Sequence, residues 1–189
     1  MAVPRLDPHR SALLVIDVQD RLMPVIEQKT TVIRRAARLA EGAEALSVPR
    51  FVTEQYSRGL GSTVPDLAKH LDQNVTAYED KTTFSACVGR IAGMLETLGI
   101  KSVVLVGVEA HVCVLFTALD LLDQGFTVAV CEDAIGSRRA VDKHAAWQRM
   151  IQAGVIPTTV ESVLFEWTGD AASDRFKAIR GIIQSKAAE

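Results

Sequence analysis

The chain reads S-V-V-L-V-G-V-E-A-H-V-C-V-L-F-T-A-L-D-L-L-D-Q-G from Ser102 to Gly125, and this stretch decides the fold. Residues 103–108 are apolar and mostly β-branched, apart from Gly107, which predicts a strand buried on both faces, as in a parallel sheet. Residues 112–122 are apolar on almost every side and suit a helix, and Gly125 suits the left-handed position after a helix end. The stretch therefore predicts a parallel strand followed by a buried helix.

Cys113 lies at the first turn of this predicted helix, just after the carboxyl end of the strand. Unpaired backbone N–H groups and the helix dipole favour a thiolate there. Functional sites of open α/β sheets also lie outside the carboxyl ends of the strands. The alternative is that Cys113 is a small buried hydrophobe, which is the commoner role of a free cysteine. Other residues must therefore decide between the two interpretations.

The whole chain has 189 residues and a net charge of -2, which predicts a single domain over residues 1–189. That charge gives no reason to expect nucleic acid or an anionic membrane as a partner. Cys87, Cys113 and Cys131 lie far apart, without the spacing of a zinc site or a disulfide framework, which favours a reducing, cytoplasmic location. We also expect no signal peptide and no membrane span, because the apolar runs are too short.

Strand and helix patterns alternate along the chain. Strands are predicted at 12–16, 50–53, 74–78, 100–108, 126–131 and 155–160, and helices at 30–46, 65–71, 87–98, 112–122, 141–153 and 173–184. This alternation predicts a three-layer α/β/α domain with a six-stranded, mostly parallel sheet. Right-handed crossovers place the carboxyl ends of all such strands on one edge of the sheet.

Two charged residues follow strand ends on the same edge as Cys113: Asp17 after strand 12–16 and Lys81 after strand 74–78. Taken singly, Asp17 is as readily a helix cap or loop residue, and Lys81 a surface lysine. Together the three suit nucleophilic acyl transfer, because the thiol must lose a proton, a carboxylate can accept it, and a cation stabilises both anions. His111 is close to Cys113 in sequence, and both a turn-fixing role and a secondary role stay open for it.

Three motifs resemble the signatures of the isochorismatase-like cysteine hydrolases: V-I-D-V-Q around Asp17, K-T-T-F-S from Lys81, and G-V-E-A-H-V-C-V around Cys113. Their order and spacing match along essentially the whole chain. The runs V-T-E-Q-Y-S-R-G-L-G and A-H-V-C-V-L-F-T-A-L-D-L-L are similar to the subgroup of isochorismatase-domain-containing proteins. The resemblance implies a Rossmann-like hydrolase fold with Asp17, Lys81 and Cys113 as a catalytic triad.

The resemblance also implies a reaction scheme. Cys113 would attack a carbonyl carbon and form a thioester, while Asp17 takes the thiol proton, passes it to the leaving group and later activates water. Lys81 would hold Asp17 and stabilise the thiolate. The family has a non-proline cis peptide that carries over to Val108–Glu109, and the N–H groups of Glu109 and Cys113 would then form the oxyanion hole.

Two departures from the family pattern narrow the reaction. Nicotinamidases in this family carry an Asp and His metal site in the loop after the second strand, but the corresponding segment here, T-E-Q-Y-S-R, has no histidine. We therefore expect no metal and no other cofactor, and nicotinamide is disfavoured. Isochorismatases proper cleave a vinyl ether and can lack the cysteine, so Cys113 favours an amide-type C–N bond. A vinyl-ether hydrolase and a non-catalytic binding or interaction module stay as alternatives.

The expected partner is a small-molecule substrate, and the expected assembly is a homo-oligomer. Gln19, Tyr56 and Phe84 are the candidate residues of the substrate pocket, because they lie on loops beside the triad. Relatives in the family commonly associate, and residues 112–122 are apolar nearly all round, which favours association of subunits.

Overall fold

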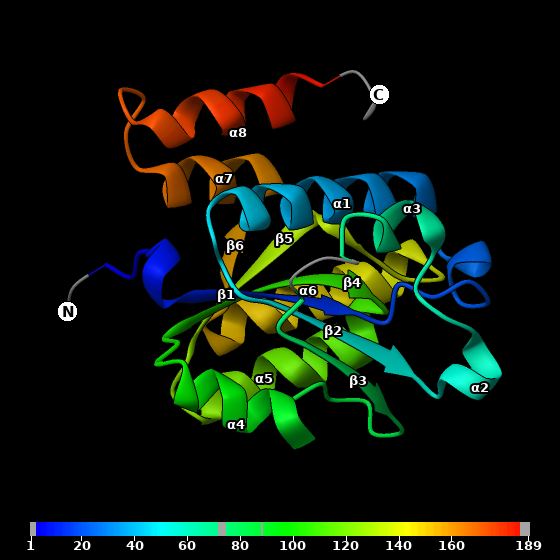
Figure 1. Cartoon of the computed structure of the whole chain (residues 1–189). Coiled ribbons are helices and arrows are strands. Elements are labelled where there is room, and N and C mark those ends of the chain that lie inside the picture. Colours follow the sequence, from blue (N-terminus) through cyan, green and yellow to red (C-terminus); the bar gives the residue numbers. More distant parts are fainter. Residues whose placement is uncertain (1–2, 72–74, 88, 186–189) are drawn as a thin grey trace.

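The computed structural model describes residues 3–71, 75–87 and 89–185. Figure 1 shows them as one twisted sheet between two layers of helices. The sheet has six strands in the order β3-β2-β1-β4-β5-β6, and every pair of neighbouring strands runs parallel. The strands are β1 (Ser11–Ile16), β2 (Arg50–Gln55), β3 (Ala77–Lys81), β4 (Ser102–Val108), β5 (Thr127–Gly136) and β6 (Ile156–Thr158). The predicted three-layer α/β/α fold is confirmed, and the sheet is parallel throughout.

The central strands β1 and β4 are buried along their entire length. Their register pairs Ala12 with Val103 and Ile16 with Gly107. A side chain at Gly107 would collide with the backbone carbonyl of Ile16, and its φ of 119° lies outside the range of other residues. Glycine at this position therefore lets β1 and β4 approach closely at their carboxyl ends, directly before Asp17 and Glu109.

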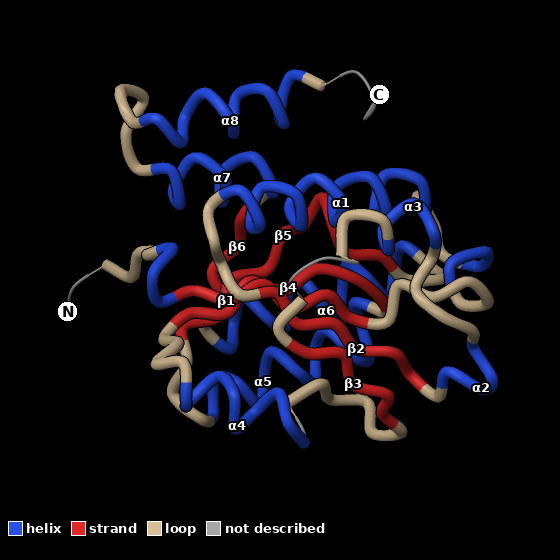
Figure 2. Tube along the Cα trace, viewed as in Figure 1, coloured by secondary structure: helices blue, strands red, loops and turns tan. Residues whose placement is uncertain are grey.

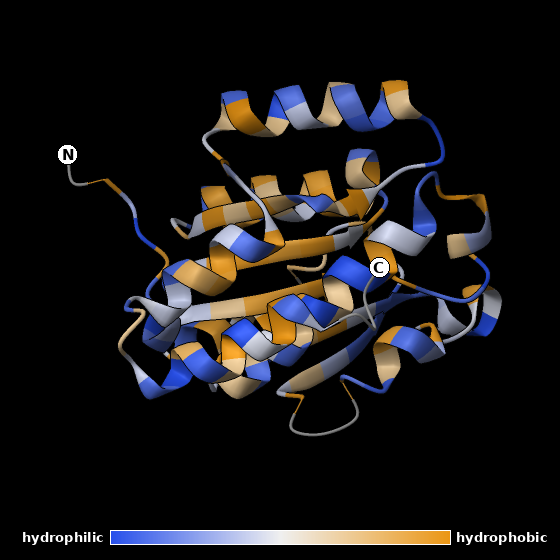
Figure 3. Ribbon diagram, turned by 90° about the horizontal axis from the view of Figure 1, so that it is seen from above, coloured by the Kyte–Doolittle hydropathy of each residue, from blue (hydrophilic) through white to orange (hydrophobic). Residues whose placement is uncertain are grey.

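Each face of the sheet has its own hydrophobic core. One core packs the sheet against α1 (Lys29–Ala45), α3 (Pro65–Ala68) and α7 (Val160–Thr168), and α8 (Asp174–Gln184) packs on α1 and α7. The other packs it against α4 (Gly89–Thr97), α5 (Leu115–Asp123) and α6 (Ala140–Ala153). Figure 2 shows the strands between these helices, and the apolar colouring of the strands in Figure 3 reflects burial on both faces. The short helix α2 (Ser57–Leu60) and 3-10 turns at Pro8–Arg10 and Met23–Val25 complete the elements.

The structure differs from the predicted elements most clearly at β3, β5 and α7. Strand β3 ends on Lys81, so this lysine belongs to the strand; the predicted start at Asn74 lies outside the described residues. Strand β5 continues through the predicted loop to Gly136, with a register shift opposite Leu105 and Gly107 of β4. Helix α7 was not predicted. Its first residue, Val160, was assigned to the strand predicted at 155–160. Thr159 caps this helix by accepting a hydrogen bond from the N–H of Ser162.

Candidate active site

Asp17 follows β1 and is completely buried at the carboxyl edge of the sheet. Its backbone has a φ of 54°, which is uncommon for a residue other than glycine, and its N–H donates to the carbonyl of Thr53 in β2. One carboxylate oxygen accepts a 2.7 Å hydrogen bond from the hydroxyl of Thr53. The other accepts one of 2.7 Å from the ammonium group of Lys81. Asp17 is thus an oriented, buried carboxylate and not a solvated loop residue.

Lys81 is the last residue of β3 and is only 4% exposed. Besides Asp17, its Nζ donates to the side-chain oxygen of Gln55 at 2.7 Å and to the carbonyls of Thr83 and Phe84 at 3.2 Å. A buried ammonium group is tolerated only with such partners. The surface-lysine interpretation is therefore wrong for Lys81, which sits as a fixed cation against Asp17.

Cys113 lies in a π-helical turn, Ala110–Val114, between β4 and α5, and its side chain is 6% exposed. Burial, followed by the negative charge of Asp17, raises the pKa of the thiol to about 12, against the opposing effect of Lys81. A smaller further effect of Asp17 also raises this pKa, and the backbone of Glu109 lowers it. The structure therefore corrects the expectation of a resting thiolate: burial and Asp17 outweigh Lys81 and the helix start, so the resting group is a neutral thiol.

The peptide bond between Val108 and Glu109 is cis. It joins β4 to the turn that carries Cys113. The side chain of Glu109 accepts hydrogen bonds from the N–H of Arg138 at 3.2 Å and from its Nε at 2.9 Å. The turn is thereby attached to the segment that follows β5.

Thr117 of α5 connects this helix to the loop that follows Lys81. This role was not predicted from the sequence. The buried hydroxyl of Thr117 donates to the carbonyl of Cys113 at 2.6 Å and accepts from the N–H of Ala86 at 2.8 Å. This fixes α5 against the segment that follows Lys81. The only sequence signal for Thr117 is a polar residue four positions after Cys113, in an otherwise apolar stretch.

The three predicted pocket residues differ in their surroundings. The amide of Gln19 is completely buried, donating to the carbonyls of Gln55 and Gly61 and accepting from the N–H of Gln55. Gln19 thus braces the loops after β1 and β2. Tyr56 and Phe84 are more than half exposed, at 55% and 56%. The rings of Phe84 and Phe116 lie 6.3 Å apart, and Phe116 is one helical turn after Cys113.

His111 is directed to a neighbour other than the triad. Its Nδ1 lies 3.0 Å from the hydroxyl of Ser137, the residue directly after β5. Of the two roles that the sequence left open, this contact supports the fixing of the turn.

Within residues 3–71, 75–87 and 89–185, no group of three or more His, Cys, Asp or Glu side chains is placed to hold a metal ion. Across the same ranges, no helix combines the length and the apolar character needed to cross a membrane.

A parallel α/β sheet with Asp17, Lys81 and Cys113 gathered at its carboxyl edge defines the class: a three-layer α/β/α fold with a candidate thiol site. Residues 11–162 match the family model of the isochorismatase domain. The chain belongs to the isochorismatase family, as its motifs predicted.

Curated relatives support this assignment. Isochorismatase domain-containing protein 1 of Danio rerio is 39% identical over 188 residues, which cover 97% of this chain and 64% of that protein. This chain therefore spans less than two thirds of the zebrafish relative. The secreted isochorismatase effector Isc1 of Phytophthora sojae is 41% identical over 184 residues, covering 95% of this chain and 87% of that one.

Solved structures share the fold over nearly the whole chain. MAR1 ribonuclease from Caenorhabditis elegans has a TM-score of 0.92 at 40% identity, covering 98% of this chain and 95% of that one. YcaC from Pseudomonas aeruginosa, solved with hexane-2,5-diol and covalent acrylamide, has a TM-score of 0.87 at 28% identity, covering 96% and 93%. YcaC from Escherichia coli, an octameric hydrolase of unknown specificity, has a TM-score of 0.83 at 26% identity, covering 96% and 92%.

Proposed function

We propose that this protein is a metal-independent cysteine hydrolase that cleaves a small amide-type C–N bond through a thioester at Cys113. One observation carries the proposal. The buried carboxylate of Asp17 is paired with Lys81 at 2.7 Å, and its negative charge acts on the Cys113 thiol and raises the pKa of that thiol. A base, a cation and a nucleophile thus meet at one point of the sheet edge.

The first step follows from the protonation states. With a pKa of about 12, only on the order of one Cys113 in 10⁵ is a thiolate at neutral pH. The proton therefore leaves during the attack of Sγ on the carbonyl carbon, and Asp17 is the acceptor already in place. Lys81 balances the negative charge that passes from Asp17 to the reacting sulfur and carbonyl oxygen.

The remaining steps reuse the same groups. The N–H groups of Glu109 and Cys113 stabilise the oxyanion of the tetrahedral intermediate. Asp17 then gives its proton to the leaving amine, the C–N bond breaks, and the acyl group stays on Cys113 as a thioester. A water molecule, deprotonated by Asp17, attacks the thioester and releases the acid and the free thiol. Tyr56 and Phe84 are proposed to contact the substrate at the exposed mouth of the site, which Gln19 braces from within.

Two observations on relatives bear on the substrate class. The covalent acrylamide in YcaC from Pseudomonas aeruginosa supports a reactive nucleophile in this fold; acrylamide reacts with nucleophiles at its alkene carbon, so the adduct does not itself identify an amide substrate. The name of the Caenorhabditis elegans structure raises ribonuclease activity as a second outcome to test. The net charge of -2 of this chain offers little attraction for an RNA backbone, so small amides take precedence.

The proposal extends to assembly and location. The octameric YcaC from Escherichia coli supports a homo-oligomer, which light scattering at micromolar concentration would reveal as a mass of at least two chains. Cys87, Cys113 and Cys131 are all unpaired, which fits a reducing, cytoplasmic location.

The deciding experiment is a substrate screen with purified protein. A panel of small primary amides is tested for ammonia release, alongside isochorismate and a single-stranded RNA, for the wild type and Cys113→Ala. We expect ammonia from at least one amide with the wild type and none with the variant. Cleavage of isochorismate by both proteins would favour the vinyl-ether reaction, and cleavage of RNA alone would favour a ribonuclease. Complete inactivity would favour a non-catalytic binding or interaction module.

A further inference from the structure

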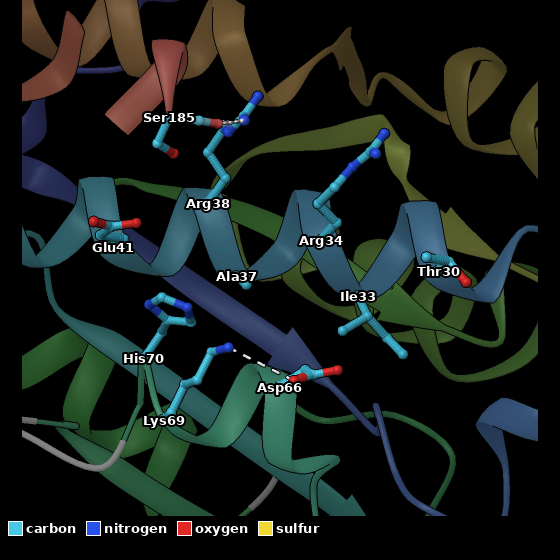
Figure 4. Close-up of a pocket in the computed structure, with 10 residues that line it drawn as sticks. All are labelled: Thr30, Ile33, Arg34, Ala37, Arg38, Glu41, Asp66, Lys69, His70 and Ser185. Atoms are coloured by element: carbon cyan, nitrogen blue, oxygen red, sulfur yellow. Dashed lines mark hydrogen bonds and ion pairs between the residues drawn. The ribbon is translucent and has the colours of Figure 1, made fainter. Parts of the chain in front are cut away.

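A groove of about 310 Å³ lies on the outer side of α1, between α3 and the end of α8. Figure 4 shows it in close-up. Ile33 and Ala37 of α1 give it an apolar wall, Arg34 and Arg38 supply two guanidinium groups, and Lys69 borders it from the end of α3. Neither Cys113 nor the groups around it line this groove, so it is separate from the candidate active site.

The arginines of α1 are crowded. Burial lowers the pKa of Arg38, and the positive charges of Arg35 and Arg34 lower it further, against the opposing effect of Glu161 and Glu41. Arg35 has a partner of its own, because its Nε lies 3.4 Å from the carboxylate of Asp133. The excess of positive charge is therefore concentrated on Arg34 and Arg38.

These two guanidinium groups have few acceptors. Arg38 donates to the carbonyl of Ser185 at 3.3 Å, but its buried Nε has no hydrogen-bond partner among the described residues. Arg34 has neither a hydrogen-bond partner nor an ion-pair partner within that part of the chain. Two acidic residues also line the groove, but they do not supply the missing acceptors. Asp66 is paired with Lys69 at 3.6 Å, and the charge of Glu41 does not restore the pKa of Arg38 to its ordinary value.

We propose that this groove binds a small organic oxyanion, a phosphate ester or a carboxylate carried on a flat apolar body. The oxyanion sits against Arg34 and Arg38, whose spacing of four residues places both on one side of α1 (Figure 4). Guanidinium groups match phosphate and carboxylate oxygens through paired hydrogen bonds. The apolar body lies over Ile33 and Ala37. The volume of the groove is within the range of small-molecule sites.

The test is isothermal titration of the full chain at low ionic strength. The probes are AMP for a phosphate ester and benzoate for a carboxylate, each with an uncharged counterpart, adenosine and benzyl alcohol. We expect at least one anion to bind more tightly than about 1 mM, and about ten-fold or more tightly than its counterpart. Which anion binds decides between the two oxyanion classes.

Arginine variants locate the binding. Arg34→Ala and Arg34→Gln should each weaken it about five-fold or more, because each removes one charge-assisted contact. Neither removes a hydrogen bond or an ion pair within the described fold, and thermal unfolding confirms that each variant is folded. Arg149→Ala, at an exposed arginine of α6 in the other helical layer, is the matched control and should bind like the wild type.

Several results would overturn the proposal. These are binding of both anions weaker than about 1 mM, equal binding of the uncharged counterparts, or unchanged binding in both Arg34 variants. Cys113→Ala should bind the anions like the wild type. The test of anion binding in this groove is therefore independent of the test of the proposed hydrolase activity.

Discussion

The Nζ atom of Lys81 lies 2.7 Å from Oδ2 of Asp17, and neither side chain is more than 1% exposed. The pair is thus removed from water, where an ion pair is favourable only while both partners are present. This mutual dependence links the stability of the fold to the chemistry of the site, because the same carboxylate also faces the Cys113 thiol.

Lys81→Met should destabilise the protein by about 3–5 kcal/mol, because it leaves the carboxylate of Asp17 buried without its cation. The double variant Lys81→Met with Asp17→Asn should be more stable than Lys81→Met alone, since the unpaired charge is gone. Chemical denaturation measures both free energies of unfolding. Lys69→Ala, which removes an exposed ion pair with Asp66, is the control and should change stability by less than about 1 kcal/mol. Equal stability of Lys81→Met and wild type would contradict the buried pair.

Cys113→Ala should abolish turnover of the best amide substrate and leave the fold intact, because alanine suits this small buried position. Asp17→Asn should lose nearly as much activity, since residues that act as a unit are not additive. Steady-state kinetics on both variants, with Cys87→Ala as the matched control, measures the loss. If Cys113→Ala kept the turnover of the wild type, Cys113 would not be the nucleophile, and the vinyl-ether reaction would become the favoured alternative.

The reaction of Cys113 with iodoacetamide should speed up about ten-fold per pH unit from pH 7 to 10. The sign follows from the thiolate fraction, which rises with pH below the raised pKa of about 12. Asp17→Asn should lower this pKa and accelerate labelling while turnover falls, whereas Lys81→Ala should slow labelling. Mass spectrometry of the Cys113 peptide gives the rates, and the Cys87 peptide is the internal control. Slower labelling in Asp17→Asn would show that the carboxylate does not hold the thiol neutral.

Thr117 is a positioning residue, and its hydroxyl is the testable group. Thr117→Val keeps the volume but leaves the N–H of Ala86 unpaired, which should cost about 1–3 kcal/mol of stability. It should also lower kcat more than it raises KM, because Cys113 and the Lys81 loop lose their common contact. Thr117→Ser restores the hydroxyl and should recover both properties. Loss of stability with unchanged kcat would make Thr117 purely structural.

Chelators should leave the hydrolase activity unchanged, since the proposed chemistry uses Asp17, Lys81 and Cys113 and no metal. Activity is compared before and after prolonged dialysis against EDTA and 1,10-phenanthroline. Stoichiometric zinc or iron in elemental analysis of the purified protein, together with lost activity after dialysis, would contradict this prediction.

The sequence was sufficient to predict the sheet and to predict that Asp17, Lys81 and Cys113 lie close together. Asp17, Lys81 and Cys113 each follow or end a recognisable strand, and parallel topology brings such ends together. The supporting contacts of Gln55 and Thr117 were not predictable, because their partners lie far along the chain and depend on packing. The direction of the Cys113 pKa shift was missed for the same reason: it is set by burial, which motif spacing does not reveal.

The amides of Gln19 and Gln55 have a consequence for how the site can diversify. Together they tie the loops after β1, β2 and β3 to one another and to the Lys81 ammonium group. A change in one of these loops therefore removes hydrogen bonds from the others. The exposed rings of Phe84 and Phe116 lie against each other and have no hydrogen-bonding group in their side chains. Substitutions of Phe84 and Phe116 are therefore expected to disturb the Asp17–Lys81 arrangement less than substitutions of Gln19 or Gln55.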